Sequence, residues 1–167
     1  MNQESLYPSL LAPFELAGKR VRNRVLHASM TTLLGENTRV TERLIRYHAN
    51  RAKGGAALIV TEPLSMAPHQ NVSYRARAWN DDNLDGLKRW AGAVESEDCR
   101  LLGQIQDPGR GRHNTGIGAH ALGASALPDD LSWTVPHALT PGLLREPASG
   151  ARRSRARPRP RSSRLRR

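Results

Sequence analysis

The stretch Gly54-Gly55-Ala56-Ala57-Leu58-Ile59-Val60-Thr61 decides the fold. Its last six residues form a short run without the alternation of a half-exposed strand, which is typical of a strand covered on both faces in a parallel sheet. The paired glycines end the preceding segment, because glycine readily adopts the backbone conformations that terminate a helix. We therefore expect a buried strand over 56–61, directly after a helix.

Helical patterns lie on both sides of this strand in the sequence. Thr41 can cap a helix over Glu42–Lys53. Its apolar stripe follows the 3.6-residue helical period: Leu44, Ile45, Tyr47, His48 and Ala52. Asn80 or Asp81 can cap a second helix. Its apolar positions recur at three- and four-residue spacing: Leu84, Leu87, Trp90, Ala91 and Val94.

Two further strands complete an alternating order of elements. Residues 14–25 are expected to form a hairpin around Gly18-Lys19, which leads into a strand over 24–30, and residues 100–106 form a strand after the second helix. The order strand, helix, strand, helix, strand predicts right-handed parallel crossovers. The fold class is therefore α/β. Residues 107–140 are rich in Gly, Pro, His and Ser, with no helical stripe and only short apolar pieces, and we interpret them as a long excursion after the third strand.

The basic charge is concentrated at the end of the chain. The net charge is +11, but ten of the 26 basic residues and only one of the 15 acidic residues lie in 141–167, so residues 1–140 carry 16 basic and 14 acidic residues. This Arg- and Pro-rich tail cannot bury a core, and we expect it to be disordered. Two hypotheses explain it: an arm that binds nucleic acid or another partner, or an out-of-frame reading of a GC-rich gene, which we favour.

Several classes of site are not supported by the sequence. Cys99 is the only cysteine, which excludes an intramolecular disulfide and a multi-cysteine metal centre in this chain. The six histidines show no metal-ligand spacing, so no metal site is assigned. No apolar run approaches the roughly 20 residues that span a bilayer, and residues 1–5 lack the features of a secretory signal. We expect a cytoplasmic protein that does not enter the membrane.

A set of short motifs, each weak alone, occurs in a characteristic order. These motifs are Leu11-Ala12-Pro13-Phe14, Asn23-Arg24-Val25, Ala28-Ser29-Met30-Thr31-Thr32, Val40-Thr41, Arg51-Ala52-Lys53-Gly54-Gly55, Leu58-Ile59-Val60-Thr61-Glu62, Gln104 and Gly109-Arg110. Over about residues 6–140 the chain resembles the old yellow enzyme family of NADH:flavin oxidoreductases. The resemblance implies an eight-stranded parallel (β/α) TIM barrel with FMN at its carboxyl-terminal mouth. Residues 1–140 are then the N-terminal portion of an incomplete barrel, roughly its first three β/α units, and 141–167 an irregular basic tail.

The resemblance also implies which residues contact FMN. Ser29, Met30 and Thr31 stand where the family usually has Pro-Met followed by Thr or Cys against the flavin edge, so Ser29 is a departure. Pro63 stands where the family generally has Ala, whose backbone lies close to the ring, and proline lacks the N–H donor. Gln104 matches a glutamine whose amide pairs with the pyrimidine edge. Two alternatives stay open: Thr31 merely ends a strand, and Gln104 is a satisfied polar group inside the barrel.

The family's reaction defines what the sequence lacks. In the family, NAD(P)H gives a hydride to FMN, which reduces an activated alkene that a His-His or His-Asn pair anchors. No such pair follows a fourth strand here, so no catalytic residue is assigned. We expect a truncated barrel that binds FMN poorly, is inactive alone unless complemented in trans, and self-associates through open strand edges.

The alternative function is non-enzymatic: the basic tail binds nucleic acid nonspecifically, with an affinity that falls steeply as salt rises.

Overall fold

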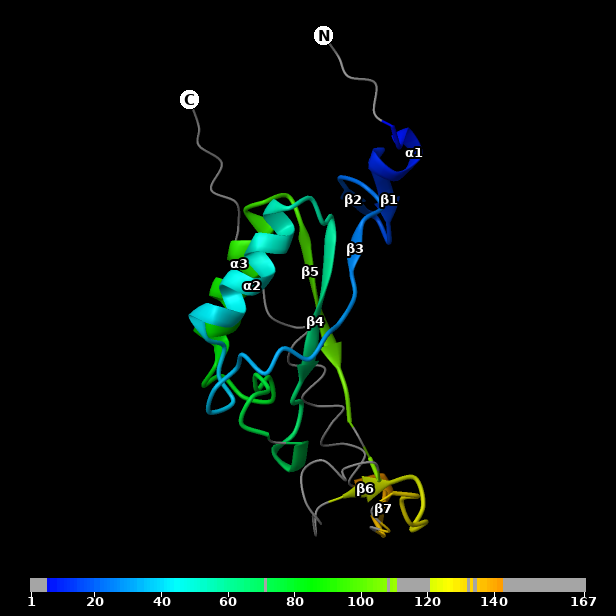
Figure 1. Ribbon diagram of the computed structural model, residues 1–167. Coiled ribbons are helices and arrows are strands. Elements are labelled where there is room, and N and C mark those ends of the chain that lie inside the picture. Colours follow the sequence, from blue (N-terminus) through cyan, green and yellow to red (C-terminus); the bar gives the residue numbers. More distant parts are fainter. Residues whose placement is uncertain are drawn as a thin grey trace.

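Three parallel strands form the central sheet of this computed structural model. Residues 6–142 are described, apart from 71, 108, 111–120, 132 and 134. The strands are β3 (Leu26–His27), β4 (Leu58–Leu64) and β5 (Arg100–Ile105), and β4 lies between the other two (Figure 1). The expected parallel α/β arrangement is confirmed.

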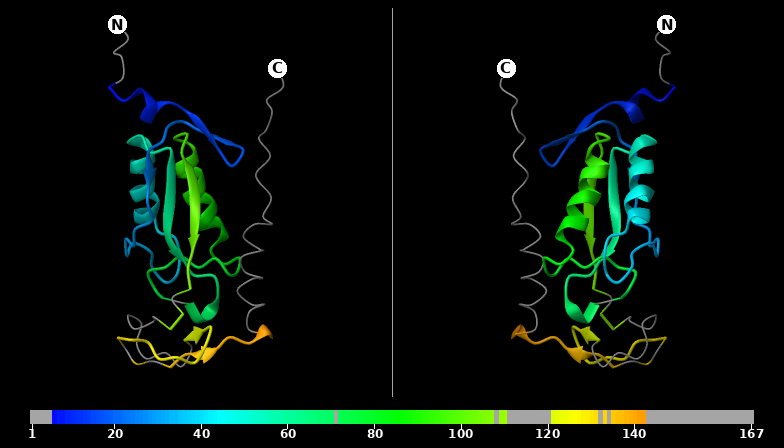
Figure 2. Two further views of the ribbon diagram at one scale, coloured as in Figure 1. Left: turned by 90° about the vertical axis from the view of Figure 1, so that its right-hand side faces the viewer. Right: turned by 90° about the vertical axis from the view of Figure 1, so that its left-hand side faces the viewer.

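The helices that connect these strands lie on one face of the sheet (Figure 2). Helix α2 (Glu42–Lys53) begins at Thr41, whose side-chain oxygen accepts a hydrogen bond from the backbone N–H of Leu44 at 3.2 Å, as predicted. Helix α3 (Leu84–Glu95) begins later than expected, with Asn83 at its cap position. The prediction of Asn80 or Asp81 as the cap is therefore wrong.

Asn83 shows why the start of α3 was misplaced. Its side chain makes no capping hydrogen bond within the helix. Instead, Asn83 Oδ1 accepts from the backbone N–H of Val40 at 3.2 Å, and its Nδ2 donates to the carbonyl of Arg77 at 3.1 Å. The side chain thus joins two loops that are distant in sequence, a role that local capping rules do not reveal.

The strands differ in length from the sequence prediction. β3 includes only two residues, because only Leu26 and His27 pair with β4. The Arg24 side chain instead donates to the carbonyls of Ser9 and Ala12, which keeps this segment with the N-terminal region. β4 continues three residues beyond Thr61, to Leu64, and β5 ends one residue earlier than predicted.

The remaining elements lie at the two ends of the sheet. α1 (Pro8–Leu11) precedes the predicted hairpin of β1 (Phe14–Leu16) and β2 (Lys19–Val21), whose turn residues Ala17 and Gly18 have positive φ angles of 49° and 69°. This hairpin is confirmed.

Beyond the carboxyl ends of the strands, a 3₁₀ turn, η1 (Pro68–Gln70), follows β4. The excursion after β5 contains β6 (Leu122–Gly123) and β7 (His137–Ala138), which pair in parallel. The predicted excursion thus contains two short strands. The tail, 143–167, lies outside the described residues.

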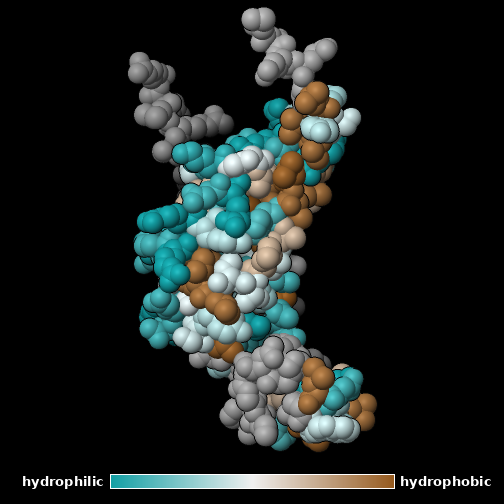
Figure 3. Space-filling model, in the orientation of Figure 1, coloured by the Kyte–Doolittle hydropathy of each residue, from teal (hydrophilic) through white to brown (hydrophobic). Residues whose placement is uncertain are grey.

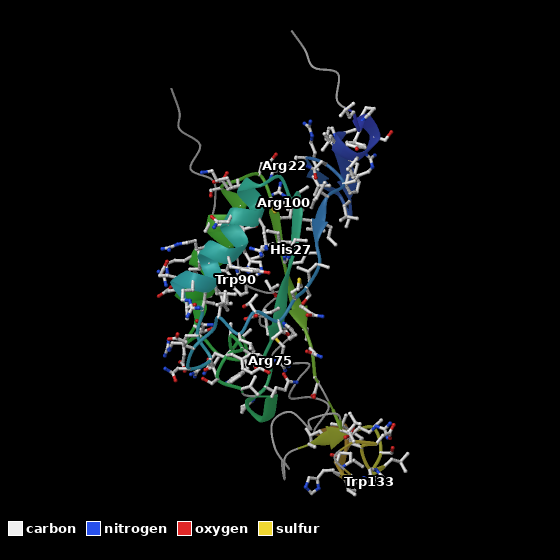
Figure 4. The ribbon with its side chains drawn as sticks, viewed as in Figure 1. Arg22, His27, Arg75, Trp90, Arg100 and Trp133 are labelled. Atoms are coloured by element: carbon white, nitrogen blue, oxygen red, sulfur yellow. The ribbon has the colours of Figure 1, made fainter. Side chains whose placement is uncertain are left out.

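The main core lies between the sheet and its two helices. Its buried members are Val40, Leu44, Ile45, Ala52, Ala56, Ile59, Ala76, Trp90, Val94 and Cys99. His27 points from β3 toward the helices, where Trp90 of α3 also lies (Figure 4). Between them lies His48 of α2, whose ring centroid is 5.8 Å from that of His27 and 5.2 Å from that of Trp90. Imidazole rings are thus part of an otherwise apolar core.

The opposite face of the sheet is more open among the described residues. His27, Ile59 and Leu101 are register partners that face the helices, so their strand neighbours face away. Two of these, Leu26 and Leu102, are 51% and 47% exposed. Figure 3 shows a hydrophobic band over α1 and the strands beside it. Exposed aliphatic residues in this part of the chain are Leu6, Leu10, Leu11, Leu16, Val25 and Leu26.

The buried imidazoles predict a pH-dependent stability. Burial lowers the pKa of His48 from 6.5 to about 4, and burial together with the charge of Arg51 lowers the pKa of His27. The folded-state pKa of His48 lies below that of a free imidazole, so its contribution to stability is complete above pH 6.5 and is lost as the pH falls toward 4; the lowered pKa of His27 acts in the same direction. We expect the free energy of unfolding in urea to decrease from pH 7.5 to pH 5, by at most about 1.4 kcal/mol per pH unit from His48.

The control for this prediction is His48→Phe, which keeps an aromatic ring and removes one titrating group. Its free energy of unfolding should depend less on pH over the same interval. An equal pH dependence in the variant and the natural chain would contradict the assignment to His48.

Candidate functional site

The carboxyl ends of the three parallel strands meet at one edge of the sheet. In Figure 1 this is the lower end, from which the chain continues toward β6 and β7. Polar side chains that follow parallel strands are brought together at such an edge, which is where α/β folds bind ligands. Four predicted flavin contacts come from the ends of β3, β4 or β5 or directly after them: Ser29, Met30, Pro63 and Gln104.

Ser29 and Gln104 contact each other across the intervening strand. The Ser29 hydroxyl, two residues beyond β3, donates a hydrogen bond to Gln104 Oε1 on β5. The backbone N–H of Gln104 donates to Thr61 Oγ1 at 3.0 Å, which fixes the main chain of the glutamine to β4. Both residues are half-buried. Two predicted site residues, 75 positions apart, thus form one polar unit.

Pro63 lies beside this unit. It is buried and is the register partner of Gln104. The pairing of β4 with β5 shifts between Val60 and Pro63. Proline inside a sheet is found at such irregularities because it cannot donate to the strand ladder. Pro63 thus lies next to Gln104 in the sheet, and its contact with a flavin stays a prediction.

Met30 and Thr31 occupy the loop after β3. Met30 is 60% exposed and Thr31 is also exposed. Within the part of the chain that the structure describes, the Thr31 hydroxyl makes no hydrogen bond. The Met30 thioether is at most a weak acceptor. The structure thus places both near the strand ends, and their role toward a ligand stays a prediction.

Glu62 is a residue that the sequence analysis did not assign to the site. Its side chain is fully buried on β4. Glu62 Oε2 accepts from the backbone N–H and from the hydroxyl of Thr32, both at 2.7 Å. Its second oxygen, Oε1, is buried and makes no hydrogen bond to any described residue. The carboxylate therefore fixes the loop that carries Met30 and Thr31 to the central strand.

A signal for Glu62 was present in the sequence. An acidic residue at the end of an apolar strand is costly to bury unless its charge is paired or hydrogen-bonded. A buried strand that ends in glutamate therefore predicts specific donors, and Thr32 supplies them.

The segment directly after β5 contains a buried side-chain oxygen, on Gln106, and a hydrogen-bonded turn at Asp107. Gln106 Oε1 is buried without a hydrogen-bond partner among the described residues. Asp107, which stands where the family often has His, accepts from the Gly109 N–H at 2.9 Å. Arg110 donates to the Pro128 carbonyl at 2.9 Å. Gly109 and Arg110 thus hold the excursion in place.

The polar groups at this edge are better suited to binding a ligand through hydrogen bonds than to transferring a proton. An amide, a hydroxyl and a hydrogen-bonded carboxylate lie at the end of an apolar sheet, which suits a flat ligand with a polar edge. The described residues include no cluster of three or more His, Cys, Asp or Glu side chains that could hold a metal ion. None of the described helices has the length and hydropathy needed to cross a membrane.

Comparisons with known proteins agree with this arrangement. The sequence model of the NADH:flavin oxidoreductase / NADH oxidase family matches residues 9–132. An NADH oxidase of Thermoanaerobacter brockii is 31% identical over 145 residues, which are 84% of this chain and 22% of the relative.

Solved structures show the same fold. Morphinone reductase in complex with tetrahydroNAD superposes with a TM-score of 0.76 at 23% identity, over 89% of this chain and 46% of that one. The old yellow enzyme from Pichia sp. AKU4542 has a TM-score of 0.72 at 18% identity, over 87% and 42% of the two chains.

The matches cover most of this chain but less than half of each relative's length. The chain spans about a fifth of the NADH oxidase and less than half of either solved structure. The family match nevertheless covers the whole central sheet, both helices and the residues at the strand ends. The chain belongs to the NADH:flavin oxidoreductase / NADH oxidase family.

Proposed function

We propose that this chain forms the first part of the FMN site of an NAD(P)H-dependent oxidoreductase of the ene-reductase type. The observation that carries the proposal is the Ser29–Gln104 unit at the carboxyl edge of a parallel sheet, within the segment that matches the family. A glutamine amide can donate to the carbonyl oxygens at the pyrimidine edge of a flavin, and its oxygen can accept from the N3–H when that oxygen is free. The substrates of the intact enzyme are then NADH or NADPH and a small activated alkene.

The residues at this edge fit the ring end of FMN. The amide group of Gln104 is half-buried at the strand ends, and Gln106 adds a buried oxygen without a partner among the described residues. Buried polar atoms are normally satisfied, so an unsatisfied one near a candidate site supports a polar ligand there. Exposed Met30 can cover an aromatic ring, because thioethers pack well against aromatic faces.

Each residue has a specific part in this proposal. Bound FMN supplies hydride transfer between NAD(P)H and the alkene. Gln104 holds the pyrimidine edge, and the Thr31 hydroxyl hydrogen-bonds the ring. Glu62 keeps the Thr31 loop in position through Thr32. Pro63 offers backbone contact without an N–H donor.

The proposal assigns no proton-transfer step to this segment. In the family a His-His or His-Asn pair beyond a fourth strand anchors the alkene, and no residue here matches that pair. We therefore propose that reduction of an alkene needs further barrel strands, and that the 167 residues alone bind FMN weakly. Salt-dependent binding of nucleic acid by residues 141–167 would concern a segment that lies almost entirely outside the described residues.

The first test is an FMN titration of the full chain and of Gln104→Leu. We expect weak, saturable quenching of flavin fluorescence by the natural chain, and an affinity about tenfold lower for the variant, because one or two hydrogen bonds to the ring are lost. Asn50→Leu is the matched control, since it also replaces an amide by leucine but on the exposed surface of α2. An equal loss in both variants would refute a specific role for Gln104.

A second test concerns Glu62. Glu62→Leu removes the acceptor of two hydrogen bonds and leaves the partly buried N–H of Thr32 unpaired, so we expect a loss of about 3 kcal/mol in the free energy of unfolding. Glu62→Gln keeps an acceptor oxygen and should lose clearly less. Urea unfolding measures both variants. Equal stability of Glu62→Leu and the natural chain would show that the carboxylate does not hold this loop.

A further inference from the structure

Ser29 differs from the residue usual at its position in the family, and the difference creates a contact. The family usually has proline there, whose ring carries no hydrogen-bonding group. Here the Ser29 hydroxyl donates to Gln104 Oε1. We propose that Ser29 is a positioning residue that orients the amide of Gln104, so that its NH₂ group, and not its oxygen, meets the pyrimidine edge of the flavin. This inference rests on the proposed function.

The main chain of Gln104 is fixed in the sheet. Its backbone N–H is bonded to Thr61 Oγ1, and its strand is in register with β4 on both sides of the irregularity. The side chain can still rotate, and rotation about its terminal bond exchanges the oxygen with the NH₂ group. The hydroxyl of Ser29 holds the oxygen on its own side. Within the described part of the chain, no acceptor contacts Gln104 Nε2, so its two N–H donors are available to a ligand.

The orientation determines which ring atoms can be recognised. The pyrimidine edge of a flavin presents a carbonyl oxygen, an N3–H donor and a second carbonyl oxygen. An amide fixed with its NH₂ group outward pairs with a carbonyl oxygen and does not require the N3–H. An amide that is free to turn can accept from the N3–H as well. Ser29 thus makes recognition at this edge depend on the carbonyl oxygens.

The experiment compares two probes, FMN and FMN methylated at N3. Each is titrated into the full natural chain, Ser29→Ala and Ser29→Thr, and the dissociation constant is measured by flavin fluorescence. For the natural chain we expect the two constants to agree within about threefold. For Ser29→Ala methylation should weaken binding about tenfold, because the freed amide then pairs with the N3–H of unmodified FMN. Ser29→Thr keeps a hydroxyl and should behave as the natural chain.

A second measurement separates this inference from the proposed function. Without flavin, the side-chain NH₂ signals of Gln104, identified by their loss in Gln104→Leu, should shift in Ser29→Ala and stay in place in Ser29→Thr. Unchanged signals in Ser29→Ala, or equal sensitivity to N3 methylation in all three chains, would overturn the inference while leaving FMN binding intact. Absence of FMN binding by the natural chain would overturn the proposed function and the ligand assigned here, even if the NMR shift establishes the contact.

Discussion

The parallel register of β4 between β3 and β5 is the constraint on which the other features depend. A parallel connection must return along the sheet before the next strand begins, so α2 and α3 both cross over it, and both cover the same face. The same register directs all three carboxyl ends to one edge. Ser29, Glu62 and Gln104 come from three different strand ends, and this topology alone makes them neighbours at that edge.

The ends of helix α2 could be predicted because they depend on residues that are close together in the sequence. Thr41 caps α2 because its oxygen reaches an N–H three residues ahead, and the Gly54-Gly55 pair marks the end of the helix. Asn83 could not be assigned in this way. Its amide bonds to Val40 and Arg77, and both contacts exist only after the loops have come together. The two-residue length of β3 has a similar cause, because pairing with β4 sets it and side-chain pattern does not.

In the candidate site, too, the sequence identified some residues but not the contacts between them. Gln104 could be identified from the resemblance, and Ser29 could be recognised as a departure from it. Their mutual hydrogen bond could not be predicted, since it depends on the spacing of strands that are 75 residues apart in sequence. Glu62 was accessible to physical reasoning alone, because a carboxylate in a buried strand requires donors. The identity of its donor, Thr32, again follows only from the fold.

The open face of the sheet connects ligand binding with folding. Leu26 and Leu102 remain about half exposed on the face away from the helices, and a parallel barrel normally fills such positions with side chains from further strands. Anything that covers this face binds only the folded sheet, so it stabilises the fold by mass action. A flavin bound as proposed would act in the same direction, because Ser29, Glu62 and Gln104 are assembled only when all three strands are in register. Under the proposed function, covering this face and binding the ring would therefore favour each other, even though they use different residues.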